Sequence, residues 1–261
     1  MEPSIPSQQS HAARLSSVSA SISGQNILSN FDLTLAKGEL VSLIGPSGCG
    51  KTTILRLLAG LQNPAEGRVE VLGKSAASAL RSGAVAFGFQ EPALLPWLTA
   101  ERNAKWLCRM RGEDIDQALF TELWALLDLS NDELSKKPNQ LSGGERQRTS
   151  LVRTLCKAAS LYLLDEPLSA VDYIRRVNIT ASLRRRLKTQ NASCVLVTHD
   201  IPDAIHFADR VVLFDEHNDR LVDFSNLDTD IDRPFETRAS QKFSEAVRVV
   251  MDQLEANNRA Q

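Results

Sequence analysis

One stretch of the sequence decides the fold: Leu40-Val41-Ser42-Leu43-Ile44-Gly45-Pro46-Ser47-Gly48-Cys49-Gly50-Lys51-Thr52. Its first five residues are a mostly apolar run of strand length, and Thr53–Leu61 follows with apolar residues at helical spacing. The residues between fit the pattern G-x-x-x-x-G-K-[ST], whose backbone N–H groups converge on phosphate oxygens at the start of a helix. Lys51 can then reach the β- and γ-phosphates of a nucleotide, and the Thr52 hydroxyl can bind Mg²⁺. A turn that uses glycine for geometry alone explains this context less well.

Strands and helices alternate along much of the chain. Apolar runs predict further strands at Arg68–Leu72, Ala84–Phe89, Leu161–Leu164, Cys194–Val197 and Arg210–Phe214. Helical spacing predicts helices over 144–157, 173–188 and Pro202–Ala208, and two helical patterns within 99–128, the second with Leu119, Leu123, Leu126 and Leu127 on one face. This alternation indicates an α/β fold with a mostly parallel sheet, and the helical stretch 99–155 indicates an inserted subdomain. Residues 1–12, rich in Ser, Gln and Pro, are expected to be a mobile tail.

Composition excludes several classes of protein. The 261 residues are 43% hydrophobic and 24% charged, as in ordinary globular proteins. Lysine and arginine number 30 against 32 acidic residues, and the net charge of −2 argues against a chain built to coat nucleic acid. No apolar run approaches the ~18 residues of a membrane-spanning helix. The beginning of the chain does not read as a secretory signal, so an intracellular protein with free thiols at its four cysteines is expected.

A second motif places two acids after an apolar run. In Leu161-Tyr162-Leu163-Leu164-Asp165-Glu166, a buried strand would bring both carboxylates to the carboxyl edge of the sheet, where open α/β folds bind ligands. Asp165 would then support bound Mg²⁺, and Glu166 would orient or deprotonate an attacking water. Taken alone, the motif fits a strand that merely leaves the core through polar residues. The phosphate loop in the same chain favours the functional interpretation.

A third motif, Leu141-Ser142-Gly143-Gly144-Glu145, is explained only in part by local structure. Ser142 and Glu145 have the spacing of a capping box at the start of a helix. That does not account for two glycines in the first turn, each of which costs about 1 kcal/mol relative to alanine. Bare N–H groups at a helix start bind anions well, so the motif predicts a second phosphate-binding surface.

With these motifs in this order and spacing, residues 14–256 resemble the ATP-binding subunits of ATP-binding-cassette (ABC) transporters. The resemblance implies a phosphate-loop NTPase with a RecA-like sheet core and an inserted α-helical signature subdomain at about 91–155. It implies a nucleotide-binding domain over 13–230 and a C-terminal extension, 231–261, with an amphipathic helix. In that family Gln90 matches the Q-loop glutamine that contacts Mg²⁺, Asp172 lies in the D-loop, and His199 is the switch histidine near the γ-phosphate.

The resemblance also implies a full set of site residues. Catalysis is assigned to Glu166 and His199, and metal binding to Thr52, Gln90 and Asp165. ATP would be bound by Gly45, Pro46, Ser47, Gly48, Cys49, Gly50, Lys51, Thr52, Thr53, Gln90 and Asp165 of one subunit and by Ser142, Gly143, Gly144, Glu145 and Asp172 of another. The implied partners are a second cassette, in a homodimer, membrane permease subunits and, indirectly, an extracytoplasmic solute-binding protein. The implied location is the inner face of the cell membrane.

Within the family, Gln90–Thr99, Asp232-Arg233-Pro234 and the closing helix resemble importers of the nitrate, sulfonate and taurine type. Two departures stand out. Ile22 occupies the position where relatives usually stack an aromatic residue on adenine, and Glu145 replaces the commonest glutamine of the signature. A soluble cassette ATPase that acts on nucleic acid or ribosomes is the alternative, although such relatives usually carry two cassettes or long insertions. A regulatory ATP-binding module with little turnover is disfavoured by Glu166 and His199.

Three other segments have competing interpretations. By composition Leu94, Leu95, Trp97 and Leu98 would belong to the core, whereas the resemblance suggests a groove for a helix of the permease. The basic run Arg184-Arg185-Arg186-Leu187-Lys188 is expected to be a solvated helix face rather than a nucleic-acid or lipid contact. The last helix has an apolar stripe of Phe243, Val247, Val250, Met251 and Leu254 and is expected to pack on the domain, because its polar face lacks the basic excess of a membrane-surface helix.

Overall fold

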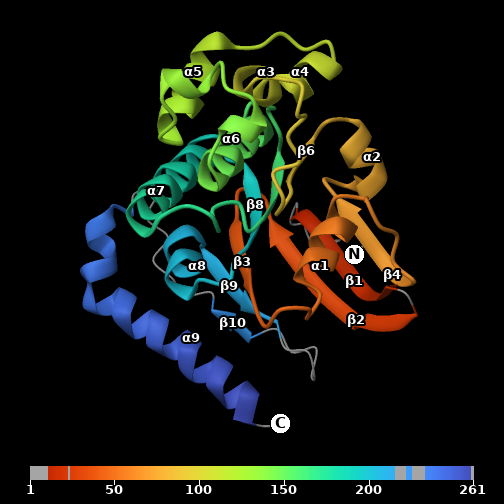
Figure 1. Cartoon of the computed structure of the whole chain (residues 1–261). Coiled ribbons are helices and arrows are strands. Elements are labelled where there is room, and N and C mark those ends of the chain that lie inside the picture. The colour runs from red at the N-terminus through yellow and green to blue at the C-terminus, as the bar shows by residue number, and fades with distance from the viewer. Residues whose placement is uncertain (1–10, 23, 215–221, 225–232, 260–261) are drawn as a thin grey trace, which may run out of the picture.

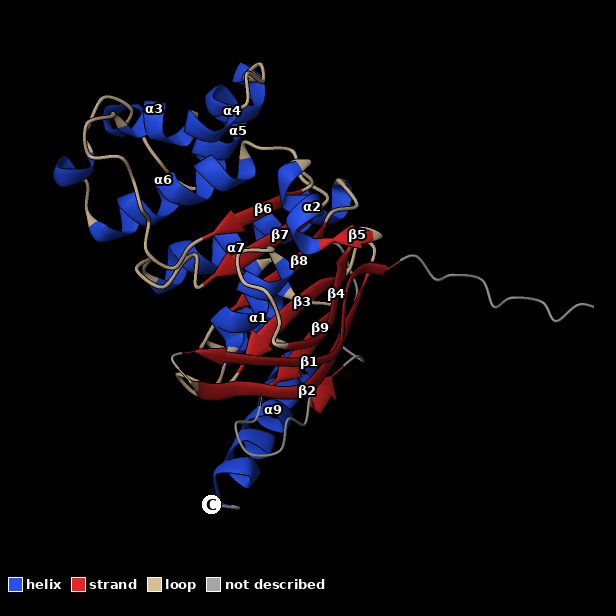
Figure 2. Ribbon diagram, turned by 90° about the vertical axis from the view of Figure 1, so that its right-hand side faces the viewer, coloured by secondary structure: helices blue, strands red, loops and turns tan. Residues whose placement is uncertain are grey.

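A six-stranded sheet forms the centre of the protein. The structure is a computed structural model, and it describes residues 11–22, 24–214, 222–224 and 233–259. The strand order is β10-β9-β3-β8-β7-β6, with β10 labelled in Figure 1 and β7 in Figure 2. The bounds are β3 Leu40–Ile44, β6 Val85–Gly88, β7 Leu161–Asp165, β8 Ser193–Val197, β9 Arg210–Leu213 and β10 Val222–Phe224. All neighbours are parallel except β10, which pairs antiparallel with β9. The α/β fold with a mostly parallel sheet is confirmed, and the carboxyl ends of β3 and β7 point to one edge.

A second, antiparallel sheet was not predicted. Its order is β2-β1-β4-β5, with β1 His11–Ile22, β2 Gln25–Ala36, β4 Glu66–Val71 and β5 Lys74–Ser75 (Figure 2). The strand expected at Arg68–Leu72 belongs here rather than to the parallel sheet, since Ala13 pairs with Val71. Residues 11 and 12 of the expected tail are part of β1, while residues 1–10 lie outside the described residues. A register shift between Leu15 and Val18 breaks the alternation that reveals a strand.

Helix α1, Lys51–Leu58, packs between the two sheets. Its residues Ile54, Leu55, Leu57 and Leu58 are buried in one core with residues of β1, β2, β3 and β7. The helix expected over Thr53–Leu61 therefore begins two residues earlier and ends three residues earlier. Helix α2, Ala76–Arg81, follows the antiparallel sheet. Burial on both sides fixes α1, and with it the end of the phosphate loop, against the edge of the central sheet.

The inserted helical segment consists of short helices packed on one long helix. The elements are α3 Ala100–Ala104, α4 Trp106–Met110, α5 Gln117–Leu126, the 3₁₀ turns η1 Asn131–Glu133 and η2 Pro138–Gln140, and α6 Gly143–Leu155. The first of the two patterns expected within 99–128 is thus two helices, divided at Lys105, where φ is −87° and ψ is 0°. Leu127 lies just beyond α5, at its C-cap. α6 runs from this layer down to the sheet (Figure 1).

The C-terminal part of the chain packs on the opposite side of the central sheet from α1. Its elements are α7 Tyr173–Thr189, α8 Ile201–Phe207, the 3₁₀ turn η3 Phe235–Ala239 and α9 Gln241–Arg259. Phe243 and Val250 of α9 are buried in the core that also holds residues of α8, whereas Met251 is exposed and does not belong to the buried stripe. Asp232 lies outside the described residues. Of the helices described, none combines the length and apolar character that crossing a membrane requires.

Candidate active site

The loop between β3 and α1 is shaped by glycines. Gly48 and Gly50 have φ values of 88° and 100°, in the left-handed region that glycine adopts at no steric cost. At Gly45 an added Cβ would lie 2.7 Å from the carbonyl oxygen of Phe214. The sequence Gly-x-x-Gly-x-Gly is therefore required by backbone geometry, and the loop ends at the N-terminus of α1, where the helix dipole favours an anion.

Lys51 and Thr52 connect this loop to the neighbouring strands. Lys51 Nζ donates to the carbonyl oxygens of Gly45 at 2.8 Å and Pro46 at 2.5 Å, and it lies 3.5 Å from Cys49 Sγ. Its ammonium is thus held within the curve of the loop. Thr52 Oγ1 donates to Asp165 Oδ2 at 2.9 Å, across 113 residues of sequence. The two motifs that the sequence places far apart meet at this hydrogen bond.

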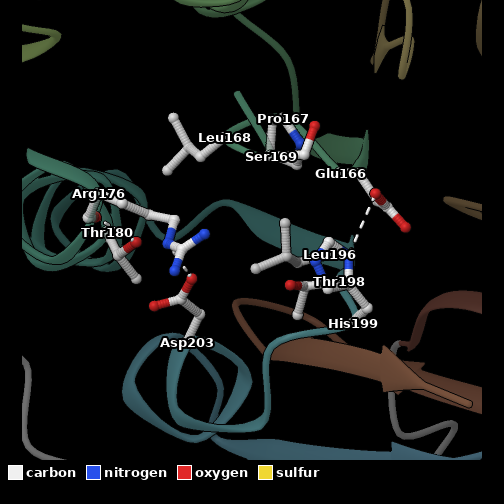
Figure 3. A pocket seen from close by; sticks show the side chains of 10 residues that line it. All are labelled: Glu166, Pro167, Leu168, Ser169, Arg176, Thr180, Leu196, Thr198, His199 and Asp203. Carbon is white, nitrogen blue, oxygen red and sulfur yellow. Dashed lines mark hydrogen bonds and ion pairs between the residues drawn. The ribbon is translucent and has the colours of Figure 1, made fainter. Parts of the chain in front are cut away.

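Asp165 and Glu166 lie at the end of β7 in different surroundings. Asp165 is buried, and burial raises the pKa of its carboxyl group while the Thr52 hydrogen bond opposes that rise. Glu166 has a φ of 44°, and its N–H donates to the Val197 carbonyl at the end of β8, 3.0 Å away. Its Oε2 lies 3.3 Å from Nδ1 of His199, whose side chain is 63% exposed (Figure 3). A carboxylate beside an imidazole at a sheet edge is suited to proton transfer.

A cleft of about 330 Å³ gathers most of these groups, whereas His199 lines a second pocket that shares Glu166 with it. It is lined by Lys51, Thr52, Gln90, Asp165 and Glu166, with Ser47, Gly48, Gly50 and Thr53 of the loop. Exposed Ile22 and partly buried Ile27 line the cleft as well and supply apolar surface. The site residues expected within one subunit are thus largely brought together, and Ile22 lies where its sequence position suggests, at the cleft.

The signature residues lie elsewhere. None of Ser142, Gly143, Gly144 and Glu145, all of which the structure describes, lines this cleft. The capping box is confirmed, since Glu145 N–H donates to Ser142 Oγ at 3.2 Å and Ser142 N–H donates to Glu145 Oε2 at 2.7 Å. At Gly144 an added Cβ would lie 2.9 Å from the Ala170 carbonyl oxygen, whereas at Gly143 the nearest atoms would be 4.0 Å away. Packing within the chain therefore explains Gly144 but not Gly143.

Two polar residues on the buried face of α6 hold the loops around the cleft. Gln147 Nε2 donates to the Glu166 carbonyl and to Ser169 Oγ, both at 2.9 Å, and its Oε1 accepts from Ala170 N–H at 2.7 Å. Arg153 donates to the carbonyls of Pro92 at 2.8 Å and Ala93 at 2.9 Å, in the segment after Gln90. One helix thus fixes both the chain beyond the acidic pair and the chain beyond Gln90.

Asp172 begins α7 rather than lining the cleft. Its Oδ1 accepts from the Arg175 N–H at 3.1 Å, which is an N-cap of the usual kind. Four residues later Arg176 turns toward α8, where it meets Asp203 in the pocket that also contains Glu166 and His199 (Figure 3). The segment from Glu166 to Arg176 therefore links the Glu166–His199 pair to the charged side chains of α7 and α8.

A phosphate loop after β3, an acidic pair after β7 and a glycine-rich signature at the start of α6 define a cassette ATPase. Residues 28–169 match the family described as ABC transporter, and the chain belongs to this family. The structure of the ATP-binding cassette MJ0796, dimeric and bound to ADP and Pi in a post-hydrolysis state, has a TM-score of 0.71 and 30% sequence identity to this chain. The match covers 78% of this chain and 94% of that cassette. The expected fold class is confirmed.

Several curated relatives with high similarity to this chain are ATP-binding proteins of importers. The chain is 36% identical over 233 residues to the aliphatic sulfonates import ATP-binding protein SsuB 1 of Burkholderia lata, covering 89% of this chain and 69% of the relative. It is 35% identical over 218 residues to SsuB 1 of Rhizobium johnstonii, covering 82% and 77%. Against SsuB 1 of Burkholderia cenocepacia it is 37% identical but spans 61% of that protein. The expected resemblance to ATP-binding subunits of ABC importers is confirmed.

Proposed function

We propose that this chain hydrolyses MgATP to energise the import of a small solute through a separate membrane permease. One observation carries the proposal: the Glu166 carboxylate lies 3.3 Å from His199 at the edge of a cleft that also holds Lys51 and the Thr52–Asp165 pair. A binding module without turnover needs the phosphate loop but not this carboxylate–imidazole pair. A phosphate-loop cleft with this pair at its edge is equipped to cleave the nucleotide.

The residues at the cleft fit a bound Mg²⁺. Thr52 and Asp165 present a hydroxyl and a carboxylate 2.9 Å apart, and the Gln90 amide lines the same cleft; Mg²⁺ prefers oxygen ligands of these kinds. Thr52, Asp165 and Gln90 would hold the ion, which supplies positive charge that neutralises the phosphate oxygens. Lys51 and the N-terminus of α1 add their own positive charge beside the β- and γ-phosphates.

Hydrolysis then follows from the position of Glu166. Its carboxylate accepts a proton from a water whose oxygen attacks the γ-phosphorus, and the bond from that phosphorus to the bridging oxygen breaks to release ADP and inorganic phosphate. His199 Nδ1 lies 3.3 Å from Glu166 Oε2 and would orient the carboxylate, and its ring is exposed to solvent. The φ of 44° at Glu166 turns its side chain out of the sheet edge. This strained turn is tied down by Val197 and Gln147.

The signature supports a site completed by a second cassette. Ser142 and Gly143 are exposed at the start of α6, and Gly143 has open space where a side chain would fit. A helix N-terminus with a bare glycine suits a facing phosphate that this chain's own cleft does not bring near. We therefore assign Ser142 to Glu145 and Asp172 to the nucleotide of a partner copy, as in the homodimer expected from the sequence.

The transported solute is proposed from the relatives. Their printed names, import of aliphatic sulfonates, favour a solute of the sulfonate, nitrate or taurine class, delivered by a solute-binding protein. The structure shows Trp97 67% exposed, so it is not the core residue that composition alone suggests. An exposed tryptophan beside the partly buried Leu94, Leu95 and Leu98 suits contact with a permease helix at the inner face of the membrane.

The basic run at 184–188 does not support the nucleic-acid alternative. Arg184, in the run expected to be a solvated face, is fully buried, donates to the Phe207 carbonyl and pairs with Asp209 at 2.9 Å. Lys188 pairs with the same carboxylate at 2.8 Å, and Arg186 pairs with Glu122. The run is thus largely consumed by internal contacts, so it does not form a basic surface for phosphates of a nucleic acid.

Phosphate release from purified chain and MgATP tests hydrolysis. Glu166→Gln is expected to lower kcat by about 10²-fold or more, the range for loss of a general base, and to retain nucleotide binding. The matched control, Glu66→Gln at an exposed position of β4, should leave kcat unchanged. Full turnover by Glu166→Gln would refute the assignment of the base.

Light scattering tests the shared site. With MgATP, Glu166→Gln should shift the chain from monomer to dimer, since the nucleotide is bound but not cleaved, and ADP should not. Adding Ser142→Arg should abolish the shift, because the bulky side chain would obstruct the facing phosphate. A dimer that tolerates Ser142→Arg would contradict a signature acting on the partner's nucleotide.

A further inference from the structure

The C-terminal segment contributes one charged side chain to the surroundings of the hydrolytic residues. Arg238 lies in η3, and its side chain is 6% exposed. Its guanidinium pairs with Asp203 Oδ1 of α8 at 2.5 Å, and the Asp203 side chain is itself 8% exposed. Arg238 therefore joins the C-terminal segment to the helix that directly follows His199.

A continuous set of ion pairs connects Arg238 to the turn that carries His199. The other oxygen of Asp203, Oδ2, pairs with Arg176 Nε at 2.8 Å, and Arg176 also pairs with Asp200 Oδ2 at 3.1 Å (Figure 3 shows Arg176 and Asp203). Asp200 Oδ1 accepts from the Asp203 N–H at 2.9 Å, and Asp200 N–H donates to Thr198 Oγ1 at 3.1 Å. Both neighbours of His199 are thus held by this set of contacts.

The same guanidinium contacts three helices. It lies 5.6 Å from the ring centroid of Tyr173, the residue after Asp172, and 5.9 Å from that of Phe243 in α9. It also lies 3.4 Å from His206 Nδ1 in α8. Arg238 therefore sits where α7, which begins at the D-loop, meets α8, which begins after the switch histidine.

Anchoring α9 does not require this arginine. Phe243 and Val250 already bury α9 against the core, and Arg233 donates to the carbonyls of Ile205 at 2.5 Å and Ala208 at 3.0 Å. A buried ion pair adds little stability relative to apolar packing, because desolvation offsets the attraction. The ion pairs among Arg238, Asp203 and Arg176 do favour one arrangement of these side chains. Through Asp200 they extend to Thr198, so they reach the two neighbours of His199.

We propose that Arg238 is a positioning residue for ATP hydrolysis, acting through Asp203, Arg176 and Asp200 to keep His199 against Glu166. The inference rests on the proposed function and extends it, because it makes the C-terminal segment part of the hydrolytic apparatus. Arg238 does not line the cleft that the phosphate loop forms. Loss of Arg238 should consequently affect the chemical step and leave nucleotide binding unchanged.

Steady-state ATPase kinetics of the full chain test this role with Arg238→Met. Asp203 keeps its pair with Arg176 in this variant, so no buried carboxylate is left alone, and methionine retains the apolar contact with Phe243. We expect kcat to fall about tenfold, within the up to 10²-fold cost of a small misplacement of catalytic groups, with KM for ATP unchanged. Arg238→Lys, which keeps the charge next to Asp203, should recover most of kcat. Arg248→Gln on the exposed face of α9 is the matched control and should behave as wild type.

The outcomes separate this inference from the proposed function. Wild-type chain without ATPase activity would refute the proposed function itself. Active wild type with unchanged kcat in Arg238→Met would overturn the positioning role, as would a raised KM at unchanged kcat. If Arg238→Met does not fold, Arg238→Gln replaces it, because its amide still donates one hydrogen bond to Asp203. The same fall in kcat is then expected, and an unchanged kcat again overturns the role.

Discussion

Gln147→Met is expected to destabilise the protein and to slow hydrolysis together. Gln147 is buried, and its amide makes three hydrogen bonds to the segment from Glu166 to Ala170, at 2.7 to 2.9 Å. Methionine matches the length of glutamine but makes none of them. At about 1 kcal/mol net for each bond, the free energy of unfolding should fall by ~3 kcal/mol.

The distribution of that loss can be followed group by group. The Glu166 carbonyl still accepts from the Ser169 N–H at 3.3 Å, so it keeps one partner. The Ala170 N–H loses the acceptor that Gln147 provides, and an unsatisfied donor costs about 1–3 kcal/mol. The segment that holds the Glu166 backbone at a φ of 44° is therefore released from α6, and kcat should decrease along with stability.

Urea unfolding, followed by circular dichroism, measures the first effect and phosphate release the second. Gln190→Met, at the exposed C-cap of α7, is the matched control and should change the free energy of unfolding by less than ~0.5 kcal/mol. A Gln147→Met protein within ~1 kcal/mol of wild type and with normal kcat would show that α6 does not hold this segment.

Three further substitutions test other parts of the molecule. Lys51→Ala should abolish tight ATP binding or turnover, because it removes the charge opposite the β- and γ-phosphates, and near-normal hydrolysis would rule out the loop assignment. Ile22→Tyr should tighten nucleotide binding by roughly 0.5–1.5 kcal/mol through stacking on adenine; a fluorescent-nucleotide titration without change would place the base elsewhere. Burial lowers the pKa of His206 from 6.5 to about 4. Between these pH values the unfolded chain binds a proton that the folded chain does not bind, so the free energy of unfolding should fall by roughly 3 kcal/mol as pH drops from 6.5 to 4. His206→Gln should remove that part of the pH dependence. An equal drop in the urea midpoint of both proteins between pH 7.5 and pH 4.5 would contradict a buried neutral histidine.

The parts of the fold that sequence predicted are those whose local pattern and burial agree. Leu40–Ile44 is buried throughout and was recognised as a strand, and the Ser142–Glu145 capping box formed as its spacing requires. The antiparallel sheet escaped because β1 buries alanines as well as Leu15 and Val18, and a register shift between those two disturbs the period. Local pattern identifies an element only where nothing interrupts it.

The residues of the candidate site also differ in whether a local sequence pattern reveals them. The residues of the phosphate loop and the acidic pair are contiguous motifs, so Lys51 and Glu166 could be assigned before the structure. Gln147 and Arg153 could not, because each is a polar side chain on the buried face of α6, where a hydrophobic pattern gives no signal. Arg238 required knowledge of which helix the C-terminal segment covers, and that is a tertiary contact without a local motif.

Helix α6 sets a fixed spacing between two parts of the nucleotide cleft. Gln147 and Arg153 are six residues apart, which at 1.5 Å per residue is about 9 Å along a helix that resists stretching. The loop beyond Gln90 and the loop beyond Glu166 are therefore both hydrogen-bonded to one stiff helix. A translation of α6 would move both loops together, whereas a tilt of α6 about one contact would move only the other loop. A tilt of α6 would therefore change the distance between Gln90 and Glu166, whereas a shift of the whole helix would not.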